Sequence, residues 1–131
     1  MGVLVDYFAA DEKSVRRPEM AHGPAGAGLP YVDCKGWLDG LDGLAAELTS
    51  GDPGEFGAEE TVAGPGDDDW LIIRVSPDVV AALAAVGDER LDGYADDELL
   101  DEFERKRLFE LRDLTCEAVR SGMDVYCWMS L

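Results

Sequence analysis

Few residues in this chain have the chemistry of catalysis or metal binding. His22 is the single histidine of the sequence, so a mechanism or metal site that needs two histidines is excluded. Cys34, Cys116 and Cys127 are widely spaced and form no CxxC pair, which argues against a zinc ribbon or a thioredoxin-type site. Cys116 and Cys127 lie in apolar patterns and are predicted to be buried, with Cys34 the more exposed thiol. The sequence therefore predicts no catalytic residue, no metal ligand and no cofactor, and it indicates a binding protein rather than an enzyme.

Carboxylates are the abundant functional group. Asp67, Asp68 and Asp69 could offer oxygen ligands to a divalent cation, but consecutive residues point in different directions and no EF-hand spacing follows. A carboxylate pair for glycoside hydrolysis forms in space rather than in sequence, so the sequence carries no signal for one. We interpret the acids instead as contacts to a cationic partner. The predicted partner-binding residues are Asp67, Asp68, Asp69, Glu59, Glu60, Asp97 and Glu98.

The charge is the most unusual property of the chain. Its 131 residues hold 29 acids against 11 Lys+Arg, a formal net charge of −18, and their 47% hydrophobic content suffices for the core of one domain over residues 1–131. Such a surface repels nucleic-acid phosphates and anionic lipids, so we expect no nucleic acid and no membrane among its partners. It favours a basic protein, although acidity also serves solubility alone. The lack of a signal-peptide pattern and of a long apolar run, with no pattern of paired cysteines, predicts a cytoplasmic location.

The elements that must position these side chains begin with three strands. Residues 2–9 are β-branched and aromatic, residues 70–75 (WLIIRV) are apolar, and residues 124–130 alternate between two faces. Because residues 2–9 are almost continuously apolar, we expect this strand to be covered on both faces, with Asp6 in need of a partner or solvent. Any fourth strand would come from 30–34 or 58–63.

Helices fill most of the remaining chain. Apolar residues at helical spacing predict helices over 36–49 and 79–86, and a long helix over 97–121 that ends at Gly122. Residues 51–69 hold seven acids and no base and are predicted to form a mobile loop, while 88–97 is predicted to be an acidic connection. The order of elements indicates an α+β fold: a small sheet of three to four strands, helices packed on it, and one long helix before the C-terminal strand.

Three stretches of the sequence carry a resemblance to known proteins. The opening MGVLVDYFAA, the middle WLIIRVSPDVVAALAAV and the ending VYCWMSL resemble a set of small uncharacterised bacterial proteins. The order of elements is also similar, more loosely, to the uncharacterised domains grouped as the DUF1877 or YfbM-like family. Neither resemblance implies an activity, a cofactor or a catalytic residue.

Two functions from different classes fit these observations. The first is an acidic protein-interaction module that neutralises a basic protein partner, as an immunity protein or an antitoxin does. The alternative is a small-molecule binding domain or weak enzyme, with a pocket lined by tryptophans and Arg74. A flat acidic face would favour the first, and a deep apolar pocket with convergent polar groups would favour the second. The tryptophans in question are Trp37, Trp70 and Trp128.

Overall fold

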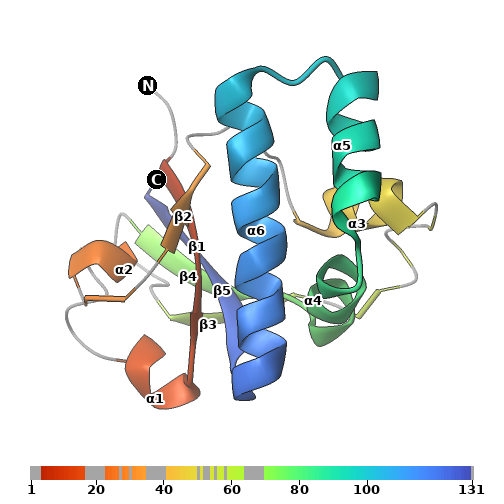
Figure 1. Cartoon of the computed structure of the whole chain (residues 1–131). Helices are drawn as coiled ribbons and strands as arrows, with labels where there is room; N and C mark the ends of the chain where they lie inside the picture. Colours follow the sequence, from red (N-terminus) through yellow and green to blue (C-terminus); the bar gives the residue numbers. More distant parts are fainter. Residues whose placement is uncertain are drawn as a thin grey trace.

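A computed structural model gives the fold of the chain (Figure 1). It describes residues 4–16, 23–26, 28–29, 31–34, 41–49, 51, 54, 56–57, 59–63 and 70–130. Asp67, Asp68 and Asp69, together with His22 and Trp37, lie outside the described residues.

The strands form one antiparallel sheet in the order β2-β1-β5-β4-β3. They are β1 (Leu4–Ala10), β2 (Tyr31–Asp33), β3 (Glu60–Ala63), β4 (Trp70–Arg74) and β5 (Asp124–Ser130). The three strands expected from the sequence lie in this sheet, so the α+β class is confirmed. The expected number of three to four strands was too low, because both candidate fourth strands pair with the sheet, one at each edge. As β3 lies within 51–69, that segment is not a loop throughout.

The central strand β5 contributes side chains to two apolar clusters, one on each face of the sheet. Its alternation places Val125 and Cys127 on one face and Tyr126 and Trp128 on the other, as the sequence predicted. β1 runs antiparallel beside it over its whole length, with Leu4 opposite Ser130. Both faces of the sheet are therefore buried.

The helices come partly as expected. They are α1 (Glu12–Val15), α2 (Gly23–Gly26), α3 (Leu41–Thr49), α4 (Pro77–Ala84), α5 (Asp88–Asp97) and α6 (Glu102–Ser121). Ser76 caps α4 by accepting a hydrogen bond from the Asp78 backbone N–H, and Pro77 takes the first helical position. Gly122 ends α6 with a left-handed φ of 69°, which glycine adopts without strain.

Two expectations about the acidic stretch before α6 were wrong. Residues 88–97 are not a connection but the helix α5, which buries Leu91 and Ala95. The long helix begins at 102 rather than 97, because the chain turns at Leu99 and is capped again at Asp101. The outcome is a helical hairpin.

The elements stack in layers around the sheet (Figure 1). α6 and α4 pack on the face that carries Val125 and Cys127, and α3 and α5 pack against these two helices. The opposite face, with Phe8 and Trp128, is covered in part by α1 and α2. Gly23 of α2 lies so close to the Trp128 indole that a Cβ there would stand 3.5 Å from the ring. No described helix is long and apolar enough to cross a membrane.

Candidate functional site

The hairpin of α5 and α6 is held by two local motifs at its turn. After α5, the Leu99 N–H donates to the Asp96 carbonyl (3.3 Å) and the Leu100 N–H donates to the Ala95 carbonyl (2.9 Å), the pattern of a Schellman motif. Before α6, Asp101 and Glu104 form a capping box: the Glu104 N–H donates to Asp101 Oδ1 (2.8 Å) and the Asp101 N–H donates to Glu104 Oε1 (3.1 Å). The turn therefore has a defined geometry.

Removing the capping residue should weaken the fold. We expect Asp101→Ala to lower the free energy of unfolding by about 1–2 kcal/mol, since the first turn of α6 loses its acceptor. Urea denaturation of both proteins measures the difference. Glu102→Ala is the matched control, because it leaves both hydrogen bonds of the box in place; equal losses in the two variants would contradict the capping role.

Arginines between the helices are engaged with acids of α5. Arg105 pairs with Asp92 (Nη1 to Oδ1, 3.0 Å) and with Asp96, and Arg112 pairs with Asp88. The Arg112 side chain is largely buried, and its Nη1 also donates to the Val86 carbonyl (2.8 Å). These pairs neutralise the side of α5 that faces α6.

Two further arginines are also used inside the fold. Arg90 donates to the carbonyls of Leu48 (Nε, 3.1 Å) and Glu47 at the end of α3, which suits the negative end of that helix dipole. Arg107 donates to the Asp33 carbonyl (Nε, 2.6 Å). Arg90 and Arg107 thus connect the hairpin to α3 and to the sheet.

The acids at the turn are left with a net negative charge. Residues 88–104 hold nine acids and one base, Arg90. We call residues 96–104, the end of α5 and the start of α6, the acidic tip. Asp97, Glu98 and Glu102 are exposed there, and no cation of the described residues forms an ion pair with them. Two predicted partner-binding residues, Asp97 and Glu98, lie in this tip.

The other predicted residues lie elsewhere. Glu60 on β3 pairs with Arg74 of β4, whose Nη1 also lies 3.7 Å from Asp124 Oδ2. Glu59 precedes the same edge strand and is largely exposed, but partial desolvation of its carboxylate, with a smaller contribution from the Asp42 carboxylate, raises its pKa. β3 lies at one edge of the sheet, whereas the acidic tip lies at the end of the α5–α6 hairpin, at the top of Figure 1. The structure therefore does not bring the described predicted residues into one face.

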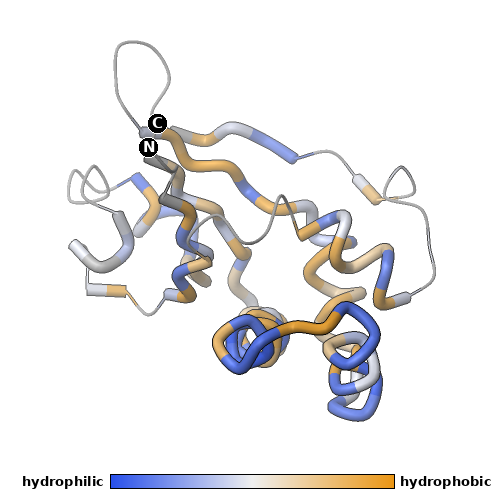
Figure 2. The backbone as a smooth tube through the Cα atoms, turned by 90° about the horizontal axis from the view of Figure 1, so that it is seen from above, coloured by the Kyte–Doolittle hydropathy of each residue, from blue (hydrophilic) through white to orange (hydrophobic). Residues whose placement is uncertain are grey.

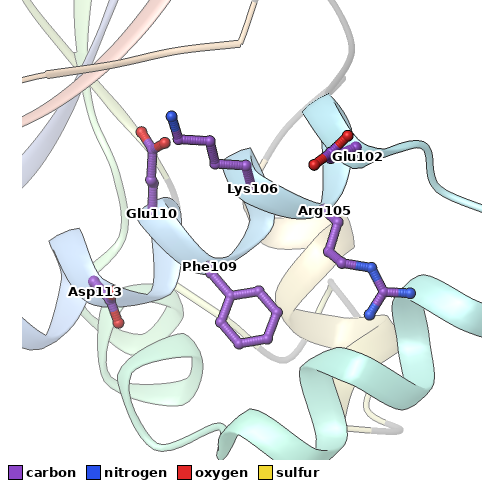
Figure 3. A pocket seen from close by; sticks show the side chains of 6 residues that line it. All are labelled: Glu102, Arg105, Lys106, Phe109, Glu110 and Asp113. Carbon is purple, nitrogen blue, oxygen red and sulfur yellow. The ribbon is translucent and has the colours of Figure 1, made fainter.

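An open hollow of about 440 Å³ lies along the outer stripe of α6 (Figure 3). Its lining residues are Glu102, Arg105, Lys106, Phe109, Glu110 and Asp113. Figure 3 shows the Phe109 ring pointing toward the neighbouring helices while Lys106 and Glu110 extend to the opposite side of α6. The polar groups do not converge on a common point, so the hollow lacks the arrangement that fixes a small ligand.

Two carboxylates oppose each other in the sheet. Asp6 of β1 is the register partner of Asp33 on β2, and Trp128 of β5 faces Asp6 from the other side. Burial and the Asp33 carboxylate raise the pKa of Asp6 to about 6. The Trp128 Nε1–H is buried and has no acceptor among the described residues. Asp6, which interrupts an apolar strand, is thus held beside a like charge.

The thiols differ from expectation at two of three positions. Cys34, expected to be the more exposed, is buried, and Cys116, expected to be buried, is exposed with its Sγ 3.3 Å from the Ala84 carbonyl. Cys127 is buried as predicted. Desolvation raises the pKa of both Cys34 and Cys127 to about 12, so these thiols are protonated at neutral pH and are weak nucleophiles. Among the described residues, no group of three His, Cys, Asp or Glu is placed to hold a metal ion.

The described residues of the alternative pocket lie on one face of the sheet, on the neighbouring strands β4 and β5. Trp128 is buried in the sheet core and Trp70 is half-buried on the same face. Arg74 is engaged by Glu60 and Asp124. None of the three lines the hollow on α6.

Sequence reasoning missed the apolar residues of the acidic tip. Leu99 was placed inside a helix that faces the core, but its side chain is 88% exposed. Phe103, in the first turn of α6, is 40% exposed, with the Arg107 guanidinium 4.4 Å above its ring. The usable signal was the sequence DELLDEFE: an acid able to cap a helix stands at Asp101, with Glu104 three residues later.

Comparisons of the chain with protein-family models, curated proteins and solved structures find no match.

Proposed function

We propose that the chain is an acidic protein-interaction module that binds a basic protein, in the manner of an immunity protein or an antitoxin. The observation that carries the proposal is the acidic tip, where Asp97, Glu98 and Glu102 are exposed and have no cationic partner in the described part of the chain. Arginines that could have balanced them are engaged between the helices. The charge is therefore available to an outside partner.

The physical benefit of this arrangement is a fast and selective encounter. Like charges gathered at one end of a molecule attract an oppositely charged protein and repel phosphates, and at physiological ionic strength this effect is strongest within the Debye length of about 8 Å. Rim charges of this kind change the association rate more than the dissociation rate. The open hollow on α6, without convergent polar groups, supports a surface contact over a small-molecule pocket.

The test removes the charge at the acidic tip. Asp97→Asn, Glu98→Gln and Glu102→Gln, combined in one variant, should lower the association rate with a captured basic protein by about tenfold at low salt, because steering is lost. Capture from an extract of the source cells at two ionic strengths identifies the protein. Surface plasmon resonance with that purified protein then gives the rates, and the difference between variant and wild type should shrink at high salt.

A matched control removes three carboxylates elsewhere. Glu12→Gln, Asp113→Asn and Glu117→Gln change acids that pair with neighbouring arginines on α1 and farther along α6. This variant should retain most of the association rate.

A third variant, with Asp67, Asp68 and Asp69 changed to Asn, examines the segment singled out by the sequence. Capture of an acidic or salt-indifferent protein, or equal effects of the tip and control variants, would contradict the proposal.

A further inference from the structure

The acidic tip carries exposed apolar side chains as well as acids. Leu99 is 88% exposed and Phe103 is 40% exposed. Figure 2, which looks down on this end of the molecule, shows the connection between α5 and α6 in the orange of hydrophobic residues between blue helix turns. The connection at the end of the hairpin is thus apolar, and acidic side chains surround it.

The backbone at Leu99 favours a different residue. Its φ is +54°, and among the described residues it is the only non-glycine with positive φ. It occupies the position after the helix cap where glycine is preferred, since a side chain with a Cβ is strained in the left-handed region. A leucine that is almost fully exposed gives the fold no burial in return. A contact with another protein would bury this side chain and compensate for the strain.

The surrounding charge defines what would make that contact. Asp97, Glu98, Asp101 and Glu102 flank Leu99 in the sequence and are all exposed. A second copy of the chain would bring acids against acids, and nucleic acid would bring phosphates. A protein with Lys and Arg around an apolar recess matches both the leucine and the carboxylates. Interfaces concentrate their binding energy in a few central residues that become fully buried, and their rims are polar.

We infer that Leu99 is the apolar anchor of the docking surface and that it inserts into an apolar recess, rimmed by Lys and Arg, on the surface of a basic protein. The inference rests on the proposed function and adds the anchor to it. Phe103, beside the same turn, extends the apolar contact.

The experiment first identifies the contact of residue 99. The full chain is prepared with the photo-crosslinking residue p-benzoylphenylalanine at position 99, and separately at position 119, where Val119 is an exposed apolar residue near the other end of α6. After irradiation in an extract of the source cells, mass spectrometry locates the attachment point. The crosslink from position 99 should lie in an apolar recess of a basic protein, and position 119 should not give this product.

The second step measures affinity for that purified protein. Leu99→Gly and Leu99→Asn both suit a left-handed backbone, so neither should lower the midpoint of thermal unfolding, yet both remove the anchor. We expect the Kd of each to rise at least tenfold, while Val119→Ala stays within twofold of wild type.

The outcomes separate the anchor from the proposed function. If the tip-charge variant slows association but both Leu99 variants bind within twofold of wild type, the anchor is overturned and the proposed function stands. If position 99 crosslinks to no basic protein and the tip-charge variant has no effect, both fail.

Discussion

Replacing Phe8 with alanine should lower the free energy of unfolding by about 3–5 kcal/mol, the usual cost of removing a fully buried aromatic side chain. Phe8 is 0% exposed and stacks on Tyr126 of β5, with ring centroids 5.6 Å apart. It lies on the sheet face opposite α6, together with Val15 of α1. Urea denaturation followed by far-ultraviolet circular dichroism measures the loss.

The control for Phe8 is an apolar residue on the surface. Val119→Ala removes methyl groups from a side chain that is 56% exposed, so its effect should stay within about 0.5 kcal/mol. A loss below about 1 kcal/mol for Phe8→Ala would mean that this face of the sheet is not a packed core, and the two-sided burial of the sheet would then be wrong.

The burial of both faces of the sheet was predictable from the apolar patterns of β1 and β5. β1 is apolar at nearly every position, which suits a strand covered on both faces. β5 alternates branched or small residues with large aromatics, and its two sets of side chains lie in two separate cores. Local patterns of this kind determine the secondary structure of a segment without help from distant residues. The three main strands and the end of α6 at Gly122 were therefore correctly predicted.

The short edge strands and α5 were harder to predict, because they depend on contacts with other elements more than on their own sequence patterns. β2 and β3 are only three and four residues long, which is too short for a clear alternating pattern, and their hydrogen bonds come from β1 and β4. α5 buries few of its residues and is acidic along most of its length. Arg90, which caps α3, and Arg105, which pairs with Asp92, help to hold it in place.

The candidate site was predictable in its charge but not in its shape. Exposure of Asp97 and Glu98 follows from their type, since isolated carboxylates are rarely buried. The pairing of Glu60 with Arg74 depends on the β3–β4 register, which the sequence does not specify. Leu99 fitted a helical apolar pattern, and only the turn that Asp101 caps moves its side chain into solvent.

Changing Asp6 to asparagine should stabilise the protein at neutral pH. The amide has nearly the shape of the protonated carboxyl group and cannot take the charge that opposes Asp33 across the β1–β2 pair. With the pKa of Asp6 at about 6 instead of 3.8, a full shift of this size would be worth about 3 kcal/mol. Because the side chain is only half-buried and solvent screens it, we expect a gain of about 1–2 kcal/mol at pH 7.

The dependence of this gain on pH follows from the protons bound in each state. Below pH 3.8 the carboxyl group is protonated in both the folded and the unfolded chain, so Asp6 costs nothing. Between pH 3.8 and about 6 the unfolded chain has already lost this proton while the folded chain keeps it, so the contribution of Asp6 to stability falls as pH rises. Above pH 6 the cost is complete and constant.

Urea denaturation at pH 3, 4, 5, 6 and 7 should therefore give curves for wild type and Asp6→Asn that coincide at pH 3 and separate up to about pH 6. Glu89→Gln, which changes an exposed acid of α5 instead of one in the sheet, is the control and should not reproduce this separation. A constant difference across the whole range would mean that packing of the amide, rather than the proton on Asp6, sets the stability. A loss at pH 7 would mean that the ionised carboxylate has a favourable partner, and that Asp33 does not govern its charge.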